Sequence, residues 1–208
     1  MSASVDLKQA ERKAFRSAFQ DGLWDIFIGC FILIFAIAPW LSEAGLGDFW
    51  SSMIFLPFWA LIYLIAWAIR RHVVVPRIGI VRFGRSRKTR MFQFNLIMFV
   101  VLLVGLLLGL LSALNPNVPG WVHTARFGLV LLLSFSVAAY FLDFAQLYLY
   151  GVLIALSPVV GEWLWTHAHI PHHGYPVTFS TTAAIIVLIG LVKFVRLLRA
   201  YPLPVEAP

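Results

Sequence analysis

Long apolar runs follow one another along the chain, and short polar segments separate them. Each run is close to the roughly 20 residues that a helix needs to cross a bilayer. The longest apolar block, residues 127–160, exceeds one span, and Asp143 with Gln146 interrupts it, which predicts a turn there. The pattern therefore predicts six transmembrane helices over residues 23–40, 53–69, 92–114, 127–142, 144–160 and 177–192.

Composition supports this membrane interpretation. Of the 208 residues, 61% are hydrophobic and 12% are charged, whereas soluble domains average roughly 45–50% and about 25%. These values exclude a soluble globular enzyme, a disordered regulator and a coiled coil. The predicted fold class is all-α: one transmembrane bundle over residues 21–199, an amphipathic surface helix over residues 1–20 and a short tail over residues 200–208.

Basic residues form three groups beside the apolar runs, at the N-terminus, between the second and third spans, and at the C-terminal end. If six spans alternate in direction, all three groups lie on one side, and Arg126 is the one basic residue on the other. Because Lys and Arg accumulate in cytoplasmic loops, both termini are predicted to be cytoplasmic, in a multi-pass protein of the cell's inner membrane. The same placement explains the net charge of +7 without a nucleic-acid partner.

The basic loop over residues 70–91 is the most unusual polar segment. Alternation around residues 77–83 predicts short strands, and thus a small β-hairpin between the second and third helices. Its basic side chains could attract anionic headgroups, at about 1 kcal/mol each, dock a partner protein, or simply keep the loop inside. They are Arg70, Arg71, Arg77, Arg82, Arg85, Arg87, Lys88 and Arg90.

Two stretches carry a resemblance. They read Asp21-Gly-Leu-Trp-Asp-Ile-Phe-Ile-Gly29 and Val75-Pro-Arg-Ile-Gly-Ile-Val81. Together they resemble a group of small uncharacterised membrane proteins of bacteria and archaea, over roughly the first ninety residues. The resemblance implies a fold and no activity.

Acidic and amide side chains in or near the spans are the candidates for ion or proton chemistry. Asp21 and Asp25 lie on one face at the start of the first span, and Asp143 and Gln146 border the predicted turn. A carboxylate near a helix N-terminus is favoured by the free N–H groups there. A carboxylate inside hydrocarbon is costly and marks functional sites. Asp25 could therefore pair with a basic residue or take part in transport.

Glycines mark candidate helix contacts. Gly22 and Gly29 lie seven residues apart in the first span, and Gly105 with Gly109 forms a GxxxG pattern in the third. Small residues let two helices approach closely. The contact could lie within the molecule or join copies in a homo-oligomer.

The predicted outer loop, residues 161–176, is rich in histidine. Metal binding, pH sensing and ordinary loop positions all suit such side chains, namely His167, His169, His172 and His173. A metal in this loop is the only cofactor that the sequence suggests. The single cysteine, Cys30, excludes a disulfide framework and a Cys-based metal site.

Transport of a small solute or ion, or ligand binding within the membrane, is the leading functional hypothesis. The main alternative is a non-catalytic assembly or sensing subunit with a partner membrane protein. A metal-binding membrane enzyme using the outer histidines is a third. The spacing of these histidines matches no standard metal-ligand pattern, which makes the enzyme hypothesis the weakest of the three. The motifs of CDP-alcohol phosphotransferases and rhomboid proteases are also absent.

Overall fold

The computed structural model describes residues 21–78, 85–115 and 117–202. Within these ranges every regular element is helical, and six segments are long and apolar enough to cross a membrane. The long helices are α2 (Leu23–Leu41), α4 (Phe55–Ile69), α6 (Arg85–Leu114), α7 (Gly120–Phe141), α8 (Gln146–Ala168) and α9 (Tyr175–Ala200). The prediction of an all-α chain with six apolar spans is confirmed.

Short elements connect several of these helices. The turn η1 (Ser42–Leu46) and the helix α3 (Asp48–Met53) join α2 to α4, whereas η2 (Arg70–Val74) and α5 (Val75–Ile78) extend α4. A single turn, η3 (His172–Gly174), precedes α9. Between α7 and α8, the chain reverses at Asp143, whose φ is 52°. The predicted division of the long apolar block at this residue is therefore confirmed.

The basic loop differs from its prediction where the structure describes it. Residues 70–78 are helical, so the expected strand does not include Arg77 or Ile78. The rest of the alternating segment, residues 79–83, lies outside the described residues. A π-turn continues α4, in which the Val75 N–H donates to the Arg70 carbonyl, and it precedes Pro76, which has no N–H to donate. The Arg77 side chain then donates to the Val73 carbonyl (2.6 Å). Continuing an existing helix costs less than starting new pairing, which outweighs the β-branched sequence.

Two other predicted segments also need comment. Helix α8 continues to Ala168 and α9 begins at Tyr175, so most of the histidine-rich segment at residues 161–176 is helical rather than loop. The predicted surface helix at residues 1–20, Arg82 of the basic loop, and residues 203–208 of the tail lie outside the described residues.

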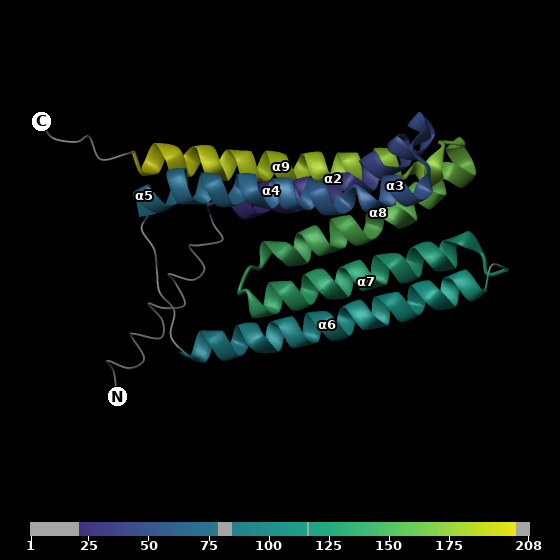
Figure 1. The fold of residues 1–208 in the computed structure, drawn as a ribbon, viewed down its shortest axis with the longest axis horizontal. Coiled ribbons are helices and arrows are strands. Elements are labelled where there is room, and N and C mark those ends of the chain that lie inside the picture. Colours follow the sequence, from purple (N-terminus) through teal and green to yellow (C-terminus); the bar gives the residue numbers. More distant parts are fainter. Residues whose placement is uncertain (1–20, 79–84, 116, 203–208) are drawn as a thin grey trace, which may run out of the picture.

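The helices pack in the order α4, α2, α9, α8, α7 and α6 (Figure 1). The buried core comes from α2, α7, α8, α9 and the α7–α8 turn, and includes Ile32, Ala139, Tyr150, Ile154 and Phe179. In contrast, α4 has no buried side chain, and the span Thr89–Leu114 of α6 has none either. The two outermost helices therefore expose apolar surface that a bilayer would cover.

Side-chain contacts define two ends of the bundle. At the basic end, Arg70 contacts Trp24 of α2, and Lys193 of α9 pairs with Asp25 of α2. Arg90 of α6 pairs with Asp143 of the α7–α8 turn at the same end. The histidine end carries Glu162 and His173. Figure 1 shows the α7–α8 turn and the end of α9 at one end of the molecule and the α8–α9 turn at the other.

Candidate functional site

A buried ion pair joins the first and last helices at the basic end. Asp25 of α2 is fully buried, and its Oδ2 accepts a hydrogen bond from Lys193 Nζ of α9 at 2.6 Å. The same ammonium group donates to Gln146 Oε1 at the start of α8 and lies 5.6 Å from the ring centroid of Phe144. Lys193 thus brings together Asp25 and Gln146, two of the residues predicted for ion chemistry.

From the sequence, Lys193 belongs only to the basic C-terminal group. Its contacts with Asp25 and Gln146 were not predicted. A sequence signal for it exists, since Lys193 follows the buried residues Ile186 and Gly190 by seven and three positions. Residues at that spacing share one face of a helix, so the face of α9 that packs in the core also carries the lysine.

Asp21 lies one turn before Asp25 and has a different role. Its side chain is buried, and Oδ1 accepts a hydrogen bond from the backbone N–H of Leu23, the first residue of α2 (3.0 Å). Burial raises the pKa of this carboxyl above its usual 3.8, partly offset by the Leu23 hydrogen bond and the charge of Arg70. The guanidinium carbon of Arg70 lies 5.8 Å from the ring centroid of Trp24. The arrangement ties the start of α2 to the end of α4.

Polar groups continue into the bundle but not continuously. The buried Tyr150 hydroxyl of α8 lies close enough to Asp25 to interact with its charge. It makes no hydrogen bond of normal geometry. Farther into the bundle, Ser157 of α8 and Thr182 of α9 share a buried hydrogen bond (2.8 Å). Between these levels lie Ile154 and Ile186, each fully buried. An apolar layer therefore separates the charged basic end from the polar pair within the bundle.

Asp143 is held by the basic loop. Arg90 of α6 donates through Nη1 to Asp143 Oδ2 (3.1 Å) and through Nη2 to the Tyr140 carbonyl (2.7 Å). Arg90 also lies 5.5 Å from the ring centroid of Tyr140. A charge-assisted pair at this turn fixes the start of α6 against the end of α7. Asp143 and Gln146 were predicted as one group for ion chemistry. In the structure, however, Asp143 pairs with Arg90 whereas Gln146 accepts from Lys193.

The histidines do not gather at one point. His173 Nδ1 contacts Glu162 Oε2 at 2.8 Å, while His167 stacks on Trp163 with ring centroids 5.0 Å apart, and His169 ends α8 with an exposed side chain. Across the described residues, no three His, Cys, Asp or Glu side chains form a group that could hold a metal ion. The Glu162–His173 contact joins α8 to the turn before α9.

The four candidate glycines have different surroundings. A Cβ on Gly22 would lie 2.3 Å from the Gly190 carbonyl oxygen, and one on Gly29 would lie 2.5 Å from a Val187 methyl group. Gly22 and Gly29 therefore allow α2 and α9 to cross closely. On α6, a Cβ on Gly105 would lie 3.1 Å from Val130, whereas one on Gly109 would meet no atom within 4 Å.

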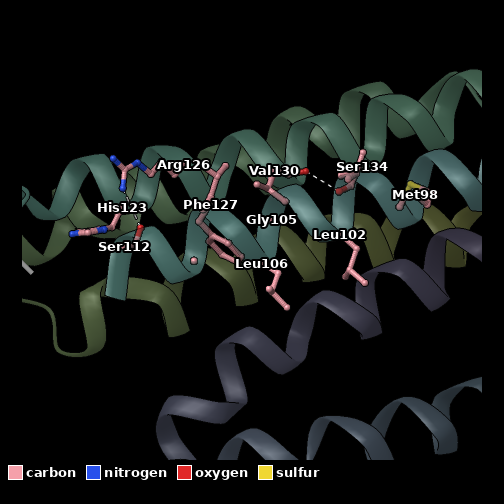
Figure 2. A pocket seen from close by; sticks show the side chains of 13 residues that line it. Met98, Leu102, Gly105, Leu106, Ser112, His123, Arg126, Phe127, Val130 and Ser134 are labelled. Carbon is pink, nitrogen blue, oxygen red and sulfur yellow. Dashed lines mark hydrogen bonds between the residues drawn. The ribbon is translucent and has the colours of Figure 1, made fainter. Parts of the chain in front are cut away.

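A pocket of about 550 Å³ lies between α6 and α7 (Figure 2). Most of its wall is apolar, and its lining includes Leu102 and Leu106 of α6 and Phe127 and Val130 of α7. Phe127 also contacts Phe35 of α2, with ring centroids 5.8 Å apart. The pocket therefore lies beside the bundle core rather than inside it, next to the least buried helix.

One end of this pocket is polar. Ser112, His123 and Arg126 line it there, and Figure 2 shows the three side chains grouped together. Arg126 Nη1 donates to Ser112 Oγ (3.3 Å), and the buried His123 Nδ1 has no hydrogen-bond partner. In the sequence, Arg126 stands out only as the single basic residue away from the basic groups. That it lines a pocket follows only from the packing of α6 on α7.

Comparison with known proteins adds no assignment. No protein-family model, no curated protein and no solved structure matches the chain. The resemblance carried by the two short stretches therefore stays a prediction.

Proposed function

We propose that this chain is a membrane protein that binds a small lipophilic molecule within the bilayer, in the pocket between α6 and α7. The observation that carries the proposal is the pocket itself, an apolar cavity of about 550 Å³ with a few polar groups at one end. Ligand sites in proteins typically combine an apolar wall with a small number of orienting polar groups.

The position of the pocket supports a ligand that arrives from the membrane. The apolar span of α6 has no buried side chain, and α6 packs mainly on α7. A molecule dissolved in the bilayer would reach the groove without passing through the core formed by α2, α7, α8 and α9. This favours ligand binding over an aqueous route through the bundle.

Ion transport through the core is less well supported by the geometry. Asp25 is paired with Lys193, and Ile154 with Ile186 separates that pair from Ser157 and Thr182. An ion path needs polar groups or water in sequence across the membrane. We therefore assign Asp25 and Lys193 to holding the helices together.

The orientation follows from charge. We propose that the basic end faces the cytoplasm, since Lys and Arg concentrate on that side of inner-membrane proteins. Arg71, which lies beside Trp67 with its guanidinium carbon 5.3 Å from the ring centroid, would then lie at the cytoplasmic surface near anionic headgroups. The pocket's polar end would lie in the outer leaflet.

A pocket-filling variant tests the function. Gly109 lines the pocket and has open space where a Cβ would be added, so Gly109→Trp should occupy the site without a backbone clash. Leu107→Trp is the matched control, because Leu107 is an exposed residue of the same helix that does not line the pocket. The readout is native mass spectrometry of protein released from nanodiscs.

The expected result is a retained small molecule or lipid on the wild type and on Leu107→Trp, and its loss from Gly109→Trp. Equal retention by all three proteins would show that bound molecules occupy some other surface, and the proposed function would be wrong.

The apolar face of α4 favours a second candidate, an assembly subunit. Exposed Tyr63, Leu64 and Trp67 lie on this helix, which has no buried side chain. A partner membrane protein, or another copy of this chain, could cover that face. Purification from the native membrane with a stoichiometric partner, lost on substituting these three residues by alanine, would support assembly instead.

A further inference from the structure

The polar end of the α6–α7 pocket contains a cation without a carboxylate partner. Arg126 makes one side-chain hydrogen bond, to the neutral Ser112, and no acidic residue within the described ranges pairs with it. A guanidinium carries five N–H donors in a planar fork. Most of its donor capacity is therefore available to an acceptor that enters the pocket.

His123 supplies a second polar group at the same place. It lines the pocket three residues before Arg126, which puts both side chains on one face of α7. Its Nδ1 is buried and has no partner. With its proton on Nδ1, the imidazole can donate to a phosphate oxygen that the guanidinium also binds.

The depth of Arg126 suits a headgroup. It lies six residues after Gly120, the first residue of α7, and thus about 9 Å along the helix axis from that end. Ser134, which lines the other part of the pocket, lies about 12 Å farther along. The cation would sit near the boundary between headgroups and hydrocarbon, and the apolar wall would extend toward the middle of the bilayer.

From this arrangement we infer that the pocket binds one anionic phospholipid, with its phosphate on Arg126 and His123 and an acyl chain along Leu102, Leu106 and Phe127. The lining residues include Arg126 and no carboxylate. A zwitterionic headgroup would bring an ammonium group that has no counter-charge there, so a net-negative lipid is preferred. The inference rests on the proposed function and adds the chemical class of the ligand.

The test uses nanodiscs that contain equal amounts of phosphatidylglycerol and phosphatidylcholine. Native mass spectrometry should find phosphatidylglycerol retained preferentially on the wild type. Arg126→Gln should reduce its retention about tenfold, the effect of losing a charge-assisted contact. Arg126→Lys should keep much of the preference, since it keeps the charge. Monodisperse elution and an unchanged helical circular dichroism spectrum serve as folding controls.

The outcomes separate the two proposals. If Gly109→Trp loses the bound lipid but Arg126→Gln retains phosphatidylglycerol as well as the wild type does, the pocket binds a ligand and the anionic class is wrong. If Gly109→Trp changes nothing, the proposed function itself is wrong. If the lipid-free protein binds inorganic phosphate and the wild type retains no lipid in nanodiscs, the site recognises a free anion. That result also overturns the inference.

Discussion

At the residue scale, the Asp25–Lys193 pair shows how the chain tolerates charge inside a membrane bundle. Asp25 is fully buried and Lys193 is partly exposed, so the lysine can remain near water while it neutralises the carboxylate. Removing one partner of a buried pair leaves an uncompensated charge, whereas removing both can be nearly neutral.

Lys193→Met should therefore destabilise the protein by roughly 3 kcal/mol, measured by denaturant unfolding in mixed micelles. Adding Asp25→Asn to this variant should recover much of the loss. Arg196→Met is the control, because Arg196 is exposed on the same helix and should have little effect. A loss for Lys193→Met no larger than that for Arg196→Met would contradict the role of the pair.

Asp21 predicts a pH dependence of stability. Burial raises its pKa in the folded protein above the unfolded value of 3.8, so the folded state binds the proton more tightly. Its contribution to stability is then greatest at low pH and is lost as pH rises through the raised pKa.

Asp21→Asn keeps an oxygen for the Leu23 N–H and removes the titration. Its stability relative to the wild type should therefore increase as pH rises from about 4 to neutrality, as measured by unfolding midpoints across that range. A constant difference between the two proteins would mean that the pKa of Asp21 does not change on folding.

At the element scale, glycine contacts set the crossing of α2 and α9. A Cβ on Gly190 would lie 2.8 Å from both the Gly22 carbonyl oxygen and the backbone nitrogen of Ile26. Gly22 itself has a φ of 81°, a conformation that glycine adopts without steric cost. The missing side chain at Gly190 and the positive φ of Gly22 together let the start of α2 lie against α9, where Asp25 meets Lys193.

Gly190→Ala should therefore cost roughly 1–3 kcal/mol of stability, since backbone atoms cannot yield as a flexible side chain does. Gly109→Ala is the matched control on α6, where the added methyl group meets no atom and stability should be unchanged or slightly higher. Thermal unfolding of the two variants in the same detergent measures the difference. Equal stabilities would argue against a close α2–α9 contact.

At the scale of the whole molecule, the two ends of the bundle differ in charge, and this predicts a single orientation in the membrane. In a Cys30→Ala background, His169→Cys and Arg199→Cys place thiols at exposed positions on opposite ends. A membrane-impermeant maleimide added to intact cells should label the first thiol and reach the second only after permeabilisation. The reverse pattern would place the basic end outside.

Sequence patterns predicted the helical spans because length and apolar character are local properties. The turn at Asp143 was predictable for the same reason, since Asp143 and Gln146 interrupt a long apolar block. The helical structure of residues 70–78 was not, because the alternation that begins at Arg77 suits a strand and only the continuation of α4 decides for a helix. The helices α6 and α7 begin, and α8 and α9 end, several residues beyond the apolar runs.

The sequence by itself determined that the chain forms six apolar helices with basic residues gathered between and beyond them. The tertiary structure alone decided that Lys193 meets Asp25 across 168 positions, that the described histidines form no group able to hold a metal ion, and that α6 and α7 leave a pocket ending on Arg126. The physical reason is that lipid tails and apolar side chains are equally hydrophobic. In a membrane, close packing and polar contacts therefore select which helix faces meet, and neither can be predicted from hydropathy.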